Sequence, residues 1–308
     1  MQSAATNLMA RLSVRRFLPV LAVGAGMALA PSLAQAAPVT TDLQLWLDAS
    51  DVDGLGGQSF TDTWADKSGQ GNDVTQANAS LRPTYSSSGG ANNQAYFDFG
   101  GSHYLDNVGF DPGISTGGFT VFTVINWDGP NTEFGQRPLA WGNTDENPSV
   151  QLRMANGSDD PNNLEWAMGG TGAGDATVGP FTPGFGSIDS DTSYLATVVR
   201  NSGSVTGYLD GAAGATVSSP TDLSTAANPV LKVGGLMGTD VVNWHGQISE
   251  ILIYDRTLSE SELNQTGFYL AQKYGIDTTY VPEPASLALL GLGGLTLLLR
   301  RRGEHAGM

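Results

Sequence analysis

Apolar residues occur in short runs throughout residues 43–254, and none of these runs repeats with the period of a helix. Each run has the length of a strand and is bounded by residues that favour turns, which the 41 glycines and 15 prolines supply in abundance. The clearest strands are predicted at 43–47, 95–99, 119–127, 149–154, 194–200, 205–209 and 248–254. The sequence therefore predicts an all-β fold and excludes a helical bundle.

Residues 119–127 carry apolar side chains at both odd and even positions. Successive side chains of a strand point to opposite faces. One face of this strand would carry Phe119, Val121, Ile125 and Trp127, and the other would carry Phe122 and Val124. A strand that is apolar on both faces is covered on both sides, so we predict that it is central in a two-sheet core.

Two local signals mark the ends of further elements. Asp210 and Gly211 both tolerate positive φ, which predicts a hairpin turn between antiparallel strands. Ser259 and Glu262 form a capping-box pattern, and Gly275 follows as a stop signal. One short C-terminal helix is therefore predicted, packed beside the final strand.

The N-terminal segment has the three parts of a secretion signal. Arg11, Arg15 and Arg16 precede an apolar stretch at 17–30, and Ala34-Gln35-Ala36 matches the small-x-small pattern of signal peptidase sites. The apolar stretch is shorter than the roughly 20 residues that span a bilayer core. We predict a signal peptide over 1–36, with cleavage between Ala36 and Ala37.

The C-terminal segment, residues 281–308, begins with Val281-Pro282-Glu283-Pro284-Ala285-Ser286. An apolar run at 287–299 and three arginines at 300–302 follow. This segment closely resembles the PEP-CTERM sorting signal, in which Pro282, Glu283 and Pro284 would be recognition residues. The resemblance implies transient insertion of a transmembrane helix, cleavage by an exosortase-type protease, and delivery to the cell surface or extracellular matrix.

The charge and composition of the region between the two signals exclude several kinds of ligand and catalytic chemistry. Residues 37–280 contain 28 acidic and eight basic residues, a net charge of about −20. Such a domain repels nucleic acid and anionic membranes. The chain has no cysteine, which excludes disulfides, thiol catalysis and cysteine-ligated metals.

Several segments resemble, in order, the laminin-G-like and concanavalin-A-like jelly rolls of bacterial surface proteins. They are L-W-L-D-A-S at 45–50, W-A-D-K-S-G-Q-G-N-D at 64–73, Y-F-D-F-G-G-S-H-Y-L at 96–105, F-T-V-F-T-V-I-N-W at 119–127 and H-G-Q-I-S-E-I-L-I-Y-D-R-T-L-S-E-S-E at 245–262. The resemblance implies one domain over 37–280, folded as a two-sheet antiparallel jelly-roll sandwich.

An enzyme of this architecture would need two carboxylates placed across a scissile glycosidic bond. No Glu-x-Asp-x-Glu pattern occurs, and Glu250 and Asp255 fall on opposite faces of their predicted strand. His103 and His245 are the domain's two histidines, and no Gly-x-Ser-x-Gly elbow accompanies them. We therefore expect no catalytic residues.

A structural calcium ion is the metal that the resemblance implies, because oxygen ligands are plentiful. The candidate ligands are Asp48, Asp51, Asp53, Asp66, Asn72 and Asp73. The spacing of the first three resembles an EF-hand, but Ser59 stands where that loop needs its closing glutamate. Solvated turn residues remain the alternative reading.

Carbohydrate binding would use aromatic side chains on loops, which stack against sugar rings. Trp64, Trp141, Trp166 and Trp244 are the candidates, with packing as the alternative, whereas Trp46 and Trp127 lie in strong strands and are assigned to the core. The glycine-rich stretch 169–186 is the predicted recognition loop. The sequence thus favours an exported, non-catalytic module that binds carbohydrate or exopolysaccharide. The alternatives are a purely structural or adhesive matrix protein and a glycan-cleaving enzyme.

Overall fold

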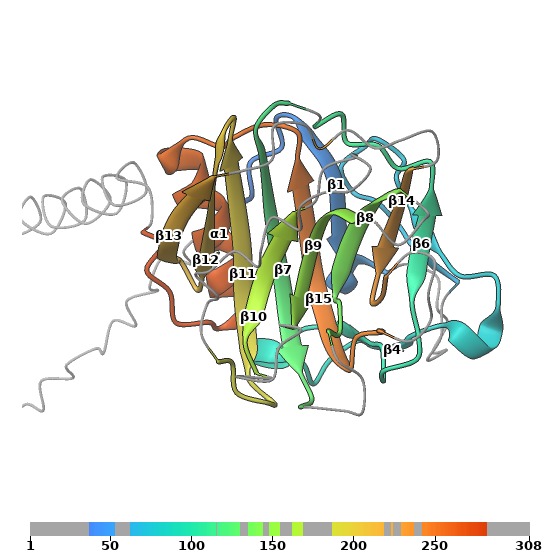
Figure 1. Ribbon diagram of the computed structural model, residues 1–308. Helices are drawn as coiled ribbons and strands as arrows, with labels where there is room; N and C mark the ends of the chain where they lie inside the picture. Colours follow the sequence, from blue (N-terminus) through green and yellow to red (C-terminus); the bar gives the residue numbers. More distant parts are fainter. Residues whose placement is uncertain are drawn as a thin grey trace, which may run out of the picture. The chain divides into compact units, whose positions relative to one another are not determined.

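Two antiparallel β-sheets stack face to face in the computed structural model (Figure 1). The structure describes residues 37–52, 62–114, 116–129, 135–143, 148–154, 162–168, 187–218, 223, 229–236 and 242–281. The predicted signal peptide, the loop 169–186 and the sorting motif at Pro282, Glu283 and Pro284 lie outside these residues. Among those described, no helix is long and apolar enough to cross a membrane.

The first sheet, sheet A, has eight strands. Its hydrogen-bonded order is β13 (Ala212–Ser218), β12 (Ser204–Leu209), β11 (Ser193–Asn201), β7 (Phe119–Trp127), β15 (Gly246–Tyr254), β5 (Tyr96–Asp98) and β4 (Thr84–Ser86). The eighth strand, β1 (Leu43–Asp48), pairs with β15 on the same edge as β5. Sheet A therefore contains all the long strands that the sequence predicts except the one at 149–154.

The second sheet, sheet B, has seven strands. Its order is β10 (Leu164–Met168), β9 (Pro148–Met154), β8 (Leu139–Asn143), β14 (Pro229–Val233), β6 (Leu105–Val108), β3 (Val74–Thr75) and β2 (Thr63–Trp64). Three short 3₁₀ turns, η1 (Ala49–Asp51), η2 (Ala79–Leu81) and η3 (Ala91–Asn93), lie in the connections. The predicted jelly-roll sandwich is thereby confirmed.

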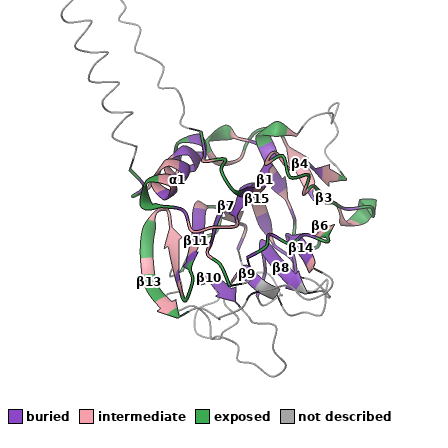
Figure 2. Ribbon diagram, turned by 90° about the horizontal axis from the view of Figure 1, so that it is seen from above, coloured by how far each residue is buried: buried purple, intermediate pink, exposed green. Residues whose placement is uncertain are grey.

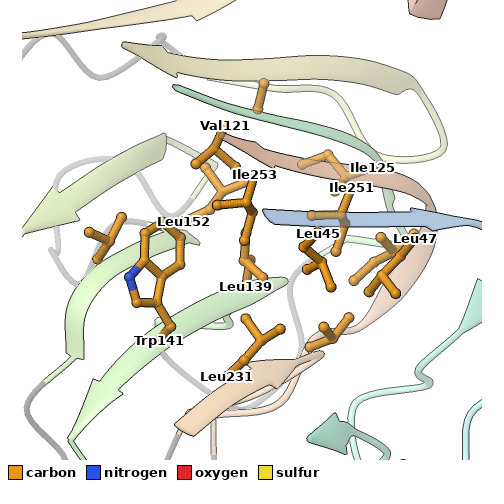
Figure 3. Packing of buried hydrophobic residues seen from close by; sticks show 14 of the residues in the cluster. Leu45, Leu47, Val121, Ile125, Leu139, Trp141, Leu152, Leu231, Ile251 and Ile253 are labelled. Atoms are coloured by element: carbon orange, nitrogen blue, oxygen red, sulfur yellow. The ribbon is translucent and has the colours of Figure 1, made fainter. Parts of the chain in front are cut away.

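The predicted two-faced strand is the centre of sheet A. Phe119, Val121, Ile125 and Trp127 of β7 lie in the core between the sheets. Figure 3 shows residues of this core, with Val121 and Ile125 opposite Leu139 and Trp141 of sheet B. The alternate residues Phe122 and Val124 belong to a second core on the outer face of sheet A.

The second core is covered by the helix α1 (Glu260–Tyr274), which lies on the side of sheet A away from sheet B (Figure 2). The predicted capping box is present, because Ser259 and Glu262 exchange hydrogen bonds. Hydrogen bonds from Arg256 lower the pKa of Glu262 to about 2. Gly275 ends the helix with φ 65°, in the left-handed region that favours glycine.

A β-bulge in β15 sets which of its side chains face α1. Ile248 and Ile251 both lie in the core between the sheets although they are three residues apart. The register opposite β7 shifts between Ile248 and Glu250, which accommodates the extra residue. Glu250 is thereby directed to the outer face, where α1 packs.

Candidate functional site

A row of polar side chains crosses the outer face of sheet A where its central strands end. Ser193 in β11 pairs with Asn126 in β7, and Asn126 also pairs with Gln247 in β15. Gln247 in turn pairs with Asp98 in β5. The preceding outward residues of β7 are apolar and lie under α1. The apolar stripe therefore stops where this polar row begins.

Three residues of this row line a cleft of about 340 Å³, which we call the sheet A cleft. Its lining consists of Gly89, Gly90, Ala91, Asn126, Asp191, Ser193 and Gln247. Gly90 packs closely against the ring of Tyr96, because a Cβ at this position would lie 2.8 Å from that ring. Every lining residue is exposed or half-buried, so the cleft is open to solvent.

Amide and hydroxyl groups dominate the chemistry of the sheet A cleft. Asn126 Nδ2 donates to Ser193 Oγ at 3.2 Å, which orients the asparagine amide. Within the described part of the chain, the side-chain amide of Gln247 forms no hydrogen bond. An amide offers both donors and an acceptor. The cleft can therefore hydrogen-bond a ligand rich in hydroxyl groups.

Carboxylates make the end of sheet A around the cleft electronegative. Asp191 lines the cleft itself, and Asp128 follows β7 two residues after Asn126. Burial first, and then the charge of Asp98, raise the pKa of Asp128, whereas His245 acts in the opposite direction. Anionic ligands would be repelled here, so the surroundings favour a neutral ligand.

Next to the polar row, a group of charged side chains is buried under α1. Asp48 of β1 and Glu250 of β15 lie directly opposite each other and are 3% and 0% exposed. Lys273 of α1 donates to Asp48 Oδ1 and to Glu250 Oε2, in both cases at 2.7 Å. Like charges opposite each other destabilise a sheet, so the lysine is the cation that offsets them. We call these three residues the Lys273 network.

Further donors complete the Lys273 network. Glu250 accepts hydrogen bonds from Trp46 Nε1 at 2.7 Å and from Tyr274 Oη at 2.8 Å. Burial, and then the charge of Asp48, raise the pKa of Glu250. Burial opposes ionisation of Asp48 as well, but the charge and hydrogen bond of Lys273 outweigh it and lower the pKa of Asp48. The network holds α1 against sheet A.

The predicted calcium ligands have other partners in the structure. Asp48 belongs to the Lys273 network, and Lys67 lies 3.0 Å from both Asp48 and Asp51. Asp66 accepts from the backbone N–H groups of Trp46, Ser68 and Asn72, and Asp73 accepts from that of Asp66. Asp53 lies outside the described residues. The positions that are described contain no group of three acidic or histidine side chains placed to share a metal. These carboxylates therefore do not fit a calcium site in this arrangement.

The four tryptophans predicted to bind sugar are buried, which corrects that expectation. Trp64, Trp141, Trp166 and Trp244 are 0–2% exposed and lie in the core between the sheets. Trp141 and Trp166 occupy inward positions of β8 and β10, where an indole fills the space between sheets. None of them can stack against a sugar in this arrangement.

Sequence reasoning missed every residue of the sheet A cleft. Its lining comes from three strands, the turn before β11 and the distant segment 89–91, and the strand register places the three strand residues together. One signal was available, because Asn126 interrupts the apolar pattern of β7. Of the two residues at the predicted cleavage site, Ala37 is described, and its carbonyl accepts a hydrogen bond from Gln265 of α1 at 3.0 Å. Ala36 lies outside the described residues.

Comparison with known families gives two matches. The concanavalin A-like lectin/glucanases superfamily matches residues 99–264, and the PEP-CTERM protein-sorting motif matches residues 281–302. The second match confirms the sorting signal that the sequence predicts. No curated protein matches the chain.

Three solved structures share the fold at low sequence identity. A Trypanosoma rangeli sialidase in complex with 2,3-difluorosialic acid has a TM-score of 0.52 and 16% identity, over 79% of this chain and 35% of that chain. Domain 4 of AbnA, a GH43 extracellular arabinanase from Geobacillus stearothermophilus, in complex with arabinotriose, has a TM-score of 0.51 and 16% identity, over 74% and 98%. The binding domain of Paraclostridial Mosquitocidal Protein 1 has a TM-score of 0.52 and 13% identity, over 76% and 53%. The match thus spans about a third of the sialidase and nearly all of the arabinanase domain.

Proposed function

Because the chain belongs to the concanavalin A-like lectin/glucanases superfamily, we propose that its domain is a non-catalytic module that binds neutral polysaccharide through the sheet A cleft. The PEP-CTERM motif marks the chain as an exported protein processed by an exosortase-type system. In this proposal, signal peptidase removes residues 1–36. The mature chain is then displayed at the cell surface or in the extracellular matrix, where it contacts polysaccharide.

The sheet A cleft is the observation that carries this proposal. It is open, large enough for one or two sugar units, and lined by amide, hydroxyl and carboxylate groups. Sugar hydroxyls both donate and accept, and the side chains of Asn126, Asp191 and Gln247 match that pattern. The negative surroundings suit a neutral sugar. The fold shared with an arabinanase domain solved with arabinotriose supports the same ligand class.

The environment of the strand glutamates supports a non-catalytic role. Glu250 is fully buried and held by Lys273, Trp46 and Tyr274. Glu165 is 2% exposed and paired with Arg153 at 2.6 Å. A general acid must reach the leaving-group oxygen of its substrate, and these carboxylates would first have to give up their partners.

A glycan array probed with the purified full chain tests the proposal. We expect saturable binding to neutral glycans, with affinity lowered about tenfold by Gln247→Ala, because two or three hydrogen bonds are lost. Asn126→Ala should have a similar effect. The matched control is Gln70→Ala, which removes an exposed glutamine that is not part of the cleft lining.

Three results would overturn the proposal. Equal binding by Gln247→Ala and Gln70→Ala would move the glycan site away from the cleft. Release of reducing ends from a bound glycan would make the protein an enzyme. Binding to no glycan on the array would instead favour a structural or adhesive matrix protein.

A further inference from the structure

The outer face of sheet B carries a row of charged and polar side chains in register. Val150 and Leu152 of β9 point into the core between the sheets, so the alternate residues Gln151 and Arg153 point outward. Gln151 pairs with Ala140 of β8. Ala140 pairs with Lys232, which pairs with Asp106 of β6. Arg153 pairs with Glu165 of β10.

Two guanidinium groups lie near one carboxylate: Glu165 of β10 is paired with Arg153 of β9 and acts on Arg137 through its charge. Arg153 Nε lies 2.6 Å from Glu165 Oε1. Arg137 donates through Nε to Gln151 Oε1 and through Nη1 to the carbonyl of Gly135, both at 2.5 Å. Within the described residues, the Nη groups of Arg153 and Nη2 of Arg137 donate to no protein acceptor. Donors for a ligand therefore remain on both arginines.

Among the described residues, the two arginines carry more charge than the carboxylate beside them. Arg137 and Glu165 are 7% and 2% exposed, and the Arg153 side chain is 13% exposed. Burial, and then the charge of Arg153, lower the pKa of Arg137 to about 10, while Glu165 opposes this. Within the described part of the chain, one buried and one half-buried cation beside one anion leave a surplus positive charge, which an anion can offset.

Arg137 and Arg153 lie on a face that gathers several of the few basic residues of an acidic domain. Residues 37–280 contain eight basic residues, and Arg137, Arg153 and Lys232 all lie on this one face. The sheet A cleft has the opposite character, with Asp191 in its lining and Asp128 nearby. The two outer faces therefore suit ligands of different charge.

We propose that Arg137 and Arg153 form a second binding site, which takes the carboxylate or sulfate group of an acidic sugar. A guanidinium presents parallel N–H groups that match the two oxygens of such an anion. Gln151 orients Arg137 and Glu165 orients Arg153, so the two forks are held in place. The site lies on a different sheet from the cleft and does not depend on it.

Calorimetric titration of the full chain with a tri-uronate tests this site. We expect saturable binding that weakens at least about tenfold when the carboxylates are methyl-esterified or when Arg137→Gln is introduced. The matched control is Arg82→Gln, which removes an arginine whose partners are Asp62 and the carbonyls of Gln76 and Ala77, and which should leave affinity unchanged. A sulfated trisaccharide in parallel distinguishes the two anions, and inorganic sulfate measures the anion without its sugar.

Several outcomes would overturn the inference. Equal affinity for the tri-uronate and its methyl ester would show that no anion is recognised. If inorganic sulfate binds as tightly as the acidic sugars, the site recognises an anion and not a sugar. An unchanged affinity in Arg137→Gln would place the site elsewhere. If that variant does not fold, the ester comparison on the unaltered chain decides. Gln247→Ala should retain uronate binding, which separates failure here from failure of the cleft.

Discussion

The two outer faces of the sandwich both hold buried charges. Counted over the described residues, these charges are balanced on sheet A and unbalanced on sheet B. On sheet A, Lys273 lies between Asp48 and Glu250, and Lys67 adds a second cation. On sheet B, Glu165 is paired with Arg153 and acts on Arg137 through its charge. The first group is covered by α1, and the second keeps guanidinium donors without a protein acceptor in the described part of the chain.

This difference indicates two roles for buried charge. A balanced network with every donor used ties one element to another, as Lys273 ties α1 to β1 and β15. A surplus charge has no ion partner in the free protein, and a ligand of opposite sign can offset it. Substitutions that remove one cation from each face should therefore have very different effects on stability.

Removing the cation of the balanced network should have the largest effect. Lys273→Met leaves Asp48 and Glu250 facing each other in a buried site, and we expect the free energy of unfolding to fall by about 3–5 kcal/mol. Denaturant unfolding of the purified chain measures this. Lys67→Met is the control, because its side chain is 27% exposed and its loss should cost under about 1 kcal/mol. Equal losses in both variants would contradict the role assigned to Lys273.

Removing a half-buried carboxylate that has no cation partner among the described residues should raise stability, and Asp210, in the turn between β12 and β13, is such a group. Burial raises the pKa of Asp210 to about 6, with opposition from its hydrogen bond to Leu195 N–H. Its stabilising contribution is therefore full below its ordinary pKa of 3.8 and is lost as pH rises through about 6.

Asp210→Asn should accordingly raise stability above pH 6 by about 1 kcal/mol, after allowance for solvent screening, and should change nothing at pH 4. Asparagine keeps the acceptor and tolerates the φ of 51° at this turn. Unfolding curves at the two pH values provide the measurement. A gain that is independent of pH would show that the carboxylate charge is not its cause.

Much of sheet A could be predicted from the sequence, because its strands are long and strongly apolar. The two faces of β7, the turn at Asp210 and Gly211, and the capped helix α1 were all predicted and are confirmed. Sheet B was largely missed. Its strands β2 and β3 have two residues each, and β10 is a five-residue strand whose second position is Glu165, so neither length nor pattern identifies them.

The candidate sites were harder to predict than the fold, for a physical reason. Ser193, Asn126 and Gln247 meet only because β11, β7 and β15 pair in one register. The tryptophans were identified by residue type, and residue type does not decide which face of a strand a side chain occupies. Lys273 was likewise not identified, since its carboxylate partners lie 23 and 225 residues away.

Removing the surplus cation of sheet B should have a small effect despite equal burial. Arg137→Met removes the hydrogen bonds to Gln151 and Gly135 but leaves Arg153 and Glu165 as a neutral pair, so we expect a loss of only about 1–2 kcal/mol. Arg137 is 7% exposed and Lys273 is 9% exposed, so burial alone would predict similar losses. Denaturant unfolding compares the two variants directly. A loss above about 3 kcal/mol in Arg137→Met would mean that the arginine is a structural element like Lys273.

The smallest effect is expected from calcium. Asp48 is held by two lysines and Asp66 by three backbone N–H groups, so an ion would have to displace partners that already satisfy these carboxylates. We expect the melting temperature in calcium and in a chelator to agree within about 2 °C. A larger, saturable increase with calcium that Asp66→Asn abolishes would show that the ion competes successfully with the backbone. The carboxylates near Asp66 would then resemble the arginines of sheet B, because both groups would have a charge that a ligand offsets.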